Sequence, residues 1–199
     1  MTPFVQRALS QAGLLPILDA RAAGEPWHLR EFQSRAQTAD WLLLGALADE
    51  IRSREVGRDV LVFANAPLPA DPRAVDLTGT AADGGIAFLR DTALTRIFSE
   101  PCARIRVGWD GLGMEFAQVA LAFGASELFG DVRFKDGELV TVDALLGHGK
   151  RSNMAPAQLV KRREIARFLS RAGRTALFAN ADGTFAQYTD DANPADALA

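Results

Sequence analysis

The chain has 199 residues, of which 48% are hydrophobic and 24% are charged, and its formal net charge is -3. This mixture is typical of one globular domain with its own core, and the lack of a long basic run argues against a dedicated nucleic-acid-binding protein. The only cysteine, Cys102, excludes a disulfide framework, a multi-cysteine zinc site and a cysteine-ligated iron–sulfur cluster within one chain. No apolar run is long enough to span a membrane and no secretion signal is recognisable, so we expect a cytoplasmic protein.

Helices are predicted from the start of the sequence. Apolar residues recur at three- and four-residue steps from Trp41 to Ile51, which predicts a helix that is capped by Thr38 or Asp40 and ended by Gly57. The same periodicity predicts later helices with buried faces between residues 86 and 97, 116 and 123, and 165 and 172.

Short apolar or alternating runs predict strands between these helices, at residues 60–63, 104–107 and 175–178. Two alternating runs around Asp136-Gly137 predict a β-hairpin from Val132 to Val142, and the proline-rich stretch from Ala66 to Gly85 predicts a loop. Because helices alternate with short strands, we expect an α/β fold with a mainly parallel sheet. One domain is expected over residues 1–188, followed by a disordered tail over residues 189–199.

One stretch resembles a known enzyme family. Residues Trp109 to Ala125 read W-D-G-L-G-M-E-F-A-Q-V-A-L-A-F-G-A. This is similar to the radical SAM enzymes that make and cyclise futalosine derivatives in menaquinone biosynthesis, and to deazaflavin synthases. In that family a strand-end tryptophan precedes a glycine-led helix with a Q-x-A-L-x-F-G-A ending. Weaker similarities, in the same order, cover most of residues 30–180. The resemblance implies β/α-barrel units, and we therefore expect a partial or degenerate β/α-barrel with N-terminal helices and a β-hairpin.

The sequence departs from the family where the cofactor would bind. In the family, the first strand leads into a three-cysteine motif that holds a 4Fe–4S cluster, whereas here Asn65 is followed by Ala66-Pro67-Leu68-Pro69. Because three thiolates are needed, we expect neither this cofactor nor radical chemistry. A full barrel typically needs about 250 residues, so the resemblance implies that several middle units are missing here. The resemblance thus implies a shortened, non-radical relative that acts as a small-molecule-binding or partner protein linked to menaquinone biosynthesis.

Ligands of parallel α/β folds bind beyond the carboxyl ends of the strands, so polar and aromatic residues that follow predicted strands are candidate ligand contacts. The candidates are Asn65, Trp109, Asp110, Glu115, His148 and Asn180. Trp109 could stack on a small aromatic or nucleoside-like ligand, or it could fill space in the core. Asp110 and Glu115 could form an acid–base pair, although a carboxylate near a helix N-terminus is favourable without any catalytic role. His148 lies in a glycine-flanked loop that could close over a ligand or simply face solvent.

The single cysteine and a short basic run are expected to have structural and not functional roles. Cys102 follows Pro101 between a predicted helix and strand, and we expect a small buried thiol there. The basic run Lys161-Arg162-Arg163 lies in a predicted helix beside Glu164, which indicates a solvated helix face. With only two histidines, far apart in the sequence, no metal site is expected.

Three functions stay open at this stage. The first is the small-molecule-binding or partner protein implied by the resemblance, without a cofactor. The second is a metal-free enzyme on a remnant barrel, and the third is a structural subunit that pairs with itself or with a full-length homologue. Deleting βα units from a closed barrel would leave unpaired sheet edges, so we expect a homo-oligomer, most simply a twofold dimer.

Overall fold

The computed structural model describes residues 1–79, 85–131, 134–135, 138–139, 162–180 and 182–188. Its helices are α1 (Pro3–Gln11), α2 (Leu15–Ala23), α3 (Arg30–Thr38), α4 (Trp41–Val56), α5 (Gly85–Phe98), α6 (Met114–Leu121) and α8 (Arg162–Arg171). Its strands are β1 (Asp59–Ala64), β2 (Ala74–Leu77), β3 (Arg104–Gly108), β4 (Glu127–Gly130), β5 (Phe134–Lys135), β6 (Glu138–Leu139), β7 (Thr175–Ala179) and β8 (Phe185–Gln187). One hydrophobic cluster extends from Leu9 to Phe178, so the described residues share a core.

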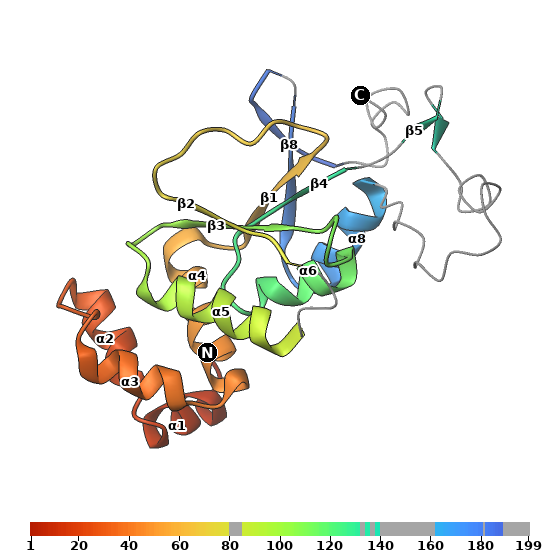
Figure 1. The fold of residues 1–199 in the computed structure, drawn as a ribbon. Coiled ribbons are helices and arrows are strands. Elements are labelled where there is room, and N and C mark those ends of the chain that lie inside the picture. Colours follow the sequence, from red (N-terminus) through yellow and green to blue (C-terminus); the bar gives the residue numbers. More distant parts are fainter. Residues whose placement is uncertain (80–84, 132–133, 136–137, 140–161, 181, 189–199) are drawn as a thin grey trace.

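Helices α1, α2 and α3 gather at one end of the molecule, where α1 and α2 pack against α4 (Figure 1). The ends of α4 confirm the prediction from sequence. The side chain of Asp40 accepts hydrogen bonds from the backbone N–H groups of Leu42 and Leu43, and Gly57 follows the helix with a φ of 74°. An aspartate N-cap satisfies donors that the first helical turn leaves unpaired, and glycine adopts a positive φ without steric penalty.

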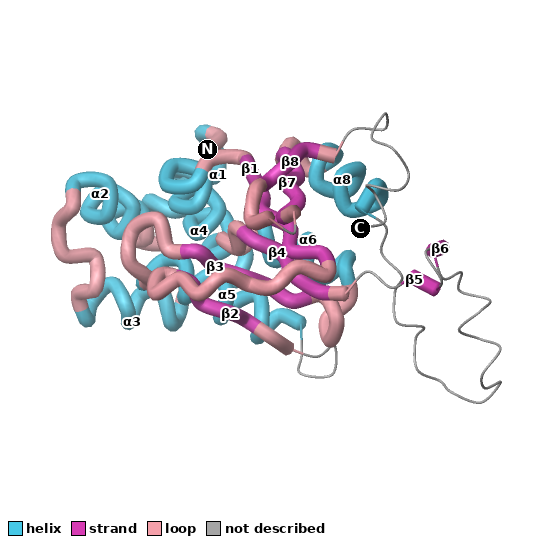
Figure 2. Tube along the Cα trace, turned by 90° about the horizontal axis from the view of Figure 1, so that it is seen from above, coloured by secondary structure: helices cyan, strands magenta, loops and turns pink. Residues whose placement is uncertain are grey.

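The main sheet has the strand order β2-β3-β4-β1-β7-β8 (Figure 2). Neighbouring strands from β2 to β7 run parallel, and only β8 pairs antiparallel, with β7. The register places Phe63 opposite Phe129 in the β1–β4 pair and Arg106 opposite Glu127 in the β3–β4 pair. The predicted α/β class with a mainly parallel sheet is thus confirmed.

The sheet is open, so the partial barrel that the resemblance implied is not confirmed. In a barrel each strand lies beside the next strand in the sequence and the last closes on the first, whereas here β1 lies between β4 and β7, and β2 and β8 are edges. Residues 65–73, which join β1 to β2, contain no helix. A crossover between adjacent parallel strands usually needs about a dozen residues or more, mostly in a helix. This shorter segment instead runs extended to the sheet edge.

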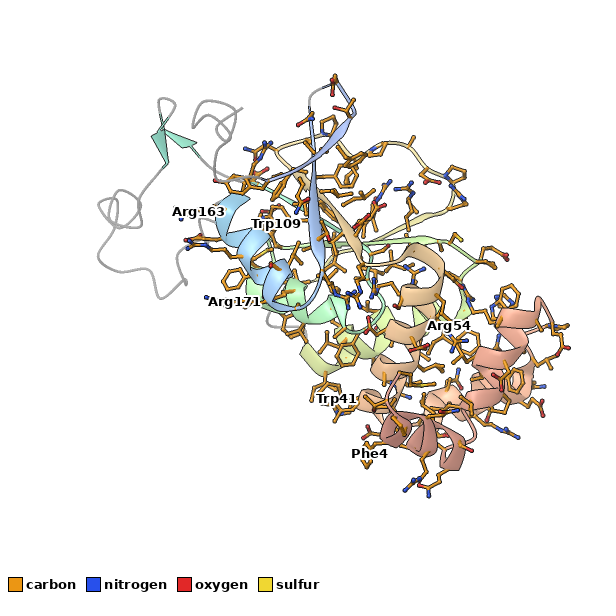
Figure 3. All side chains as sticks on the ribbon, turned by 180° about the vertical axis from the view of Figure 1, so that it is seen from behind. Phe4, Trp41, Arg54, Trp109, Arg163 and Arg171 are labelled. Atoms are coloured by element: carbon orange, nitrogen blue, oxygen red, sulfur yellow. The ribbon has the colours of Figure 1, made fainter. Side chains whose placement is uncertain are left out.

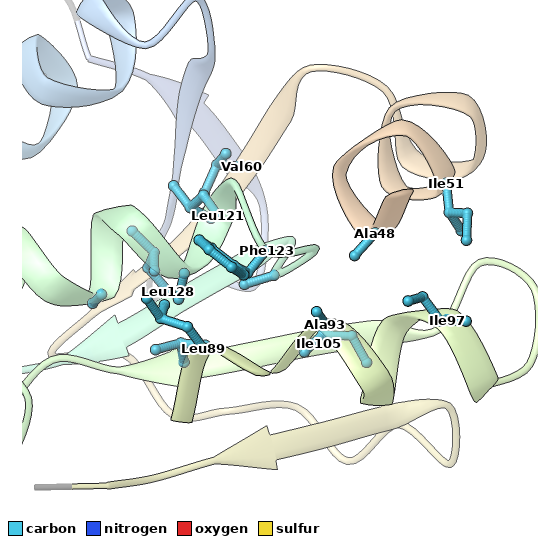
Figure 4. Packing of buried hydrophobic residues seen from close by; sticks show 14 of the residues in the cluster. Ala48, Ile51, Val60, Leu89, Ala93, Ile97, Ile105, Leu121, Phe123 and Leu128 are labelled. Carbon is cyan, nitrogen blue, oxygen red and sulfur yellow. The ribbon is translucent and has the colours of Figure 1, made fainter. Parts of the chain in front are cut away.

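Helices α4, α5, α6 and α8 cover one face of the sheet, and the core lies between these helices and the strands (Figures 1 and 4). Because successive strand residues point to opposite faces, every second strand residue reaches this core. The core-facing strand residues include Val60, Val62, Ile105, Val107 and Leu128. From the helices come Ala48, Ile51, Leu89, Ala93 and Ile97, as the three- and four-residue spacing predicts. The prediction is wrong for Ile86 and Val119, which were expected on buried helix faces but are 58% and 44% exposed.

Several elements differ from the prediction. The stretch predicted as a loop contains the short edge strand β2, and the sequence analysis did not predict β4, whose four residues begin with a glutamate. The predicted hairpin is confirmed in part, because β5 and β6 pair antiparallel. The remainder of that hairpin, the residues before α8, His148 and the predicted tail 189–199 lie outside the described residues.

Candidate functional site

The face of the sheet opposite the helices carries polar and aromatic side chains. Arg106 and Glu127 alternate with core residues in β3 and β4 and therefore lie on this face, yet they are only 3% and 2% exposed. Residues 65–73, which we call the strap, contact Arg106 there. Figure 1 shows the strap as the loop that leaves the carboxyl end of β1 and runs back toward the start of β2.

An ion-pair network fastens the strap to the sheet. Glu127 accepts hydrogen bonds from Arg104 (2.7 Å to Oε1) and from Arg106 (2.9 Å to Oε2). Arg106 also donates to the backbone carbonyl of Pro69 in the strap (2.9 Å), and Arg104 pairs with Asp71 near the end of the strap (3.0 Å). Hydrogen bonds between charged groups are stronger than neutral ones, so this network holds the strap against the sheet.

A pocket of about 600 Å³ lies at the carboxyl ends of β1 and β4. Two aromatic residues line it, Phe63 and Phe129, which are register partners on these adjacent strands. Asn65, Asp110 and Asp131 add polar groups to the lining. The described lining is completed by Ala66, Pro67, Leu68 and Gly130, the first three from the strap.

The pocket lies at the topological switch point of the sheet. The connection from β1 leads toward β2 at one edge, whereas the connection from its neighbour β4 leads past β1 toward β7. When chains leave two adjacent parallel strands in opposite directions, a crevice remains between them, and open α/β proteins bind their ligands there. The strand order therefore makes this pocket the leading candidate for a binding site.

The structure brings two of the predicted residues, Asn65 and Asp110, into this pocket. Asn65 follows β1 with a φ of 57°, and its backbone N–H donates to the carbonyl of Gly130 (3.1 Å). Asparagine tolerates this left-handed conformation better than most residues do. Asp110 is exposed, and its Oδ1 accepts a hydrogen bond from the backbone N–H of Asp131 (3.0 Å). This bond holds the Asp110 carboxylate in the pocket lining.

Trp109 lies behind the pocket lining. Its side chain is 3% exposed and belongs to the hydrophobic core. Its Nε1–H donates to the carbonyl of Asp131 (3.2 Å), and its ring packs so closely on Gly130 that an added Cβ there would lie 2.5 Å from ring atoms. This placement favours the packing role over direct stacking on a ligand. It also puts Trp109 in contact with two residues that line the pocket.

The remaining candidates lie elsewhere. Glu115 is exposed in the first turn of α6, where a carboxylate is favourable at the helix N-terminus, and it is not among the described residues that line the pocket. The side chain of Asn180 donates to the hydroxyl of Thr184 (2.9 Å), and its backbone closes the turn between β7 and β8. The structure thus does not bring Glu115 or Asn180 together with Asp110.

Sequence reasoning missed Phe63, Phe129 and Asp131 as site residues. Phe63 lies in a run that indicates a buried strand, and Phe129 and Asp131 lie in and just after the unpredicted β4. A signal was nevertheless present, because Phe63-Ala64-Asn65 and Phe129-Gly130-Asp131 share one pattern. In each, a phenylalanine and a small residue end the strand, and a polar residue follows directly after it. Two such strand ends side by side form an aromatic pocket with polar groups.

A second buried charge cluster, centred on Glu55, lies at the amino ends of the strands. Glu55 pairs with Arg21 (2.5 Å) and Arg96 (3.7 Å), and burial lowers the pKa of Arg96 to about 10, although Glu55 opposes this shift. Cys102 was predicted to be a buried thiol, but it is exposed. The reason is local, since Cys102 has a φ of 59° and uses its backbone N–H to bind Glu55 (3.0 Å). This cluster ties α2, α4 and α5 together.

The chemistry of the switch-point pocket suits binding. Phenyl rings favour a flat, partly apolar ligand, and carboxylate or amide oxygens accept hydrogen bonds from hydroxyl and amino groups. Its described lining contains no serine, cysteine, lysine or histidine, so carboxylates are the only acid–base groups there. Among the residues that the structure describes, no group of three or more histidine, cysteine, aspartate or glutamate residues could hold a metal ion.

Comparisons with known proteins assign no family. No protein-family model matches the chain, and no curated protein shows significant similarity to it. The resemblance to radical SAM enzymes therefore stays a prediction from sequence. None of the described helices has the length and apolar character that crossing a membrane requires.

Proposed function

We propose that the chain binds a small molecule with a flat ring and hydroxyl or amino groups, of which a nucleoside is the simplest example. The binding site is the pocket at the carboxyl ends of β1 and β4. The observation that carries the proposal is that Phe63 and Phe129 share one pocket with Asn65, Asp110 and Asp131 at the switch point of the sheet. Aromatic surface and hydrogen-bond acceptors together match both parts of such a ligand.

The two parts of the ligand would bind to different groups. A flat ring would lie against the half-buried Phe129, because aromatic pairs prefer offset or edge-to-face contact, whereas Phe63 is only 2% exposed and would support the lining. Hydroxyl groups of a ribose would donate to the carboxylates of Asp110 and Asp131, as ribose hydroxyls do to acidic residues in other open α/β folds. The bond from the N–H of Asp131 uses only one of several lone pairs on Asp110 and fixes its orientation.

The strap would determine the shape of the pocket. Ala66, Pro67 and Leu68 line one side of it, and the bond from Arg106 to the carbonyl of Pro69 holds the next part of the strap in place. The guanidinium carbon of Arg106 also lies 5.8 Å from the centre of the Phe63 ring. The ion-pair network therefore supports the pocket indirectly, by holding both the strap and an aromatic residue of the lining.

The two alternative functions have less support. A metal-free enzyme that uses Asp110 and Glu115 together would need both in one site, and only Asp110 lines the pocket among the described residues. A structural subunit would not require an aromatic and acidic pocket at the switch point. A role beside the enzymes of menaquinone biosynthesis rests on the sequence resemblance alone and stays a prediction.

Fluorescence of Trp109 provides the test, because this residue contacts Gly130 and Asp131 of the lining. In a variant with Trp27→Phe and Trp41→Phe, Trp109 is the remaining tryptophan. Titration with adenosine should give a saturable change, and adenine without its ribose should bind more weakly. Asp110→Asn should weaken adenosine binding by about tenfold, which corresponds to one charge-assisted hydrogen bond.

The matched control is Asp19→Asn, because Asp19 is exposed on α2 and does not line the pocket. It should leave the affinity unchanged. Phe129→Leu, which removes a ring while keeping an apolar side chain, should weaken adenosine and adenine alike. A fluorescence signal that does not change with any nucleoside or free base would refute the proposal, as would equal losses from Asp110→Asn and Asp19→Asn.

A further inference from the structure

A second hollow, of about 300 Å³, lies between α8 and the strands β7 and β8. Three arginines line it, Arg163 and Arg167 from α8 and Arg174 just before β7. The described lining is completed by Ala166, Ser170, Thr175, Ala176, Gln187 and Tyr188. None of these residues lines the switch-point pocket, so the two hollows are separate.

Helix geometry explains why the basic side chains converge. Residues 166 and 167 lie three and four positions after residue 163, and residue 170 lies four and three positions after them, so all four form one stripe on α8. Figure 3 places Arg163 near the start of α8 and Arg171 near its end, and only Arg163 of these two lines the hollow. The basic segment, expected from sequence to be a solvated helix face, thus contributes one arginine to a concave surface. Its neighbour Arg162 lies over the ring of Phe178, 5.6 Å from the ring centre.

Arg174 is the most informative residue of the hollow. Its side chain is 8% exposed, and its Nη2 donates to Asp49 (2.7 Å) and to the carbonyl of Leu121 (3.1 Å). Its Nη1 is buried and has no hydrogen-bond partner among the residues that the structure describes. A buried donor without an acceptor is unfavourable, and such groups in native proteins commonly meet a water or an ion.

The local charge also favours an anion. Guanidinium groups in one hollow repel one another unless negative charge lies between them. Asp49 offsets part of the charge of Arg174, but Arg52 shares the same carboxylate oxygen (3.0 Å). Ser170, Thr175 and Tyr188 add hydroxyl groups that can donate to oxyanion oxygens. Arginine is suited to such anions because its planar fork can bind two oxygens at once.

We infer that the hollow between α8 and β7–β8 is a binding site for a phosphate group, carried either by inorganic phosphate or by a small phosphomonoester. Arg163 and Arg167 would approach the oxyanion from the helix, and Arg174 would approach from the start of β7. This site goes beyond the proposed pocket for a flat-ring ligand and does not depend on it.

Calorimetric titration of the full chain with inorganic phosphate and with glycerol phosphate tests the inference, with chloride used to keep the ionic strength constant. Arg167→Gln should weaken binding by about tenfold or more, since it removes one charge-assisted contact without touching the core. The control is Arg171→Gln, which makes the same charge change on the same helix outside the hollow. It should change the affinity by less than about twofold, because distant exposed charges are screened.

A second measurement does not rely on the heat of binding. Phosphate should raise the melting temperature of the wild-type chain relative to chloride, and Arg167→Gln should remove that shift. If glycerol phosphate binds more tightly than inorganic phosphate, the natural ligand is a phosphomonoester. If the two bind equally, the ligand is inorganic phosphate. The inference is overturned if neither compound binds, or if Arg171→Gln weakens binding as much as Arg167→Gln does.

Discussion

Glu127 is the carboxylate that Arg104 and Arg106 share on the strap-covered face of the sheet, and its replacement by glutamine should destabilise the protein. The side chains of Glu127 and Arg106 are 2% and 3% exposed, so Arg106 would keep a buried charge without its main partner. Removing one partner of a buried ion pair costs about 3–5 kcal/mol. Arg106 keeps a contact with Asp76 at 3.4 Å, and Arg104 is 37% exposed and can turn to water. We therefore expect a loss of about 3 kcal/mol, at the lower end of that range.

Urea unfolding followed by circular dichroism measures this loss, and a double-mutant cycle identifies its origin. Arg106→Leu combined with Glu127→Leu removes both charges, so the double variant should be more stable than the sum of the single losses predicts. Arg104→Gln, at a partly exposed position, should cost less than about 1 kcal/mol. A stability of Glu127→Gln within about 0.5 kcal/mol of the wild type, or additive losses from the two leucine substitutions, would show that the buried ion pair does not stabilise the protein in this way.

Three further predictions concern packing, cofactor and assembly. Gly45→Ala in α4 should lower the free energy of unfolding by about 1–3 kcal/mol, since a Cβ there would lie 2.7 Å from the Phe123 ring. Helix propensity alone predicts a higher free energy of unfolding for this variant, and that result in urea unfolding would contradict the packing argument. Anaerobic reconstitution with iron and sulfide should leave no cluster absorbance after gel filtration, because Cys102 is the only cysteine. Light scattering should give a dimer mass, because β2 and β8 are sheet edges; a monomer mass at every concentration would show that the chain protects its own edges.

Local elements of the fold could be predicted from the sequence because their signals are local. Asp40 and Gly57 lie directly before and after α4, and the apolar residues of the helix recur every three or four positions, so each of these signals spans only a few residues. The buried strands β1, β3 and β7 were predicted for the same reason. By contrast, β2 and β4 are four residues each, and β4 begins with Glu127, a residue that no local rule places in a buried strand. Its burial is possible because Arg104 and Arg106 from the neighbouring strand pair with it.

The candidate site was predictable only in part. Asn65 and Asp110 were identified because each follows a strand that the sequence predicts, and ligands gather at such ends. Their shared pocket was not predictable, because it depends on β4 pairing with β1 and on the hydrogen bond that holds Asp131 against Asp110. Trp109 shows the opposite case. Its position after a strand is compatible with a ligand contact, but close packing on Gly130 places it behind the lining.

By itself, the sequence determined the periodic helices such as α4, the parallel α/β character and the lack of cysteines for a cluster, since these depend on composition or on neighbouring residues. The tertiary structure decided the strand order, the open sheet and the two hollows. The physical reason is that strand pairing joins residues far apart in the chain, and its energy depends on partners that no local pattern reveals. Glu127 is buried only beside Arg106, and Phe63 and Phe129 line one pocket because β4 pairs with β1.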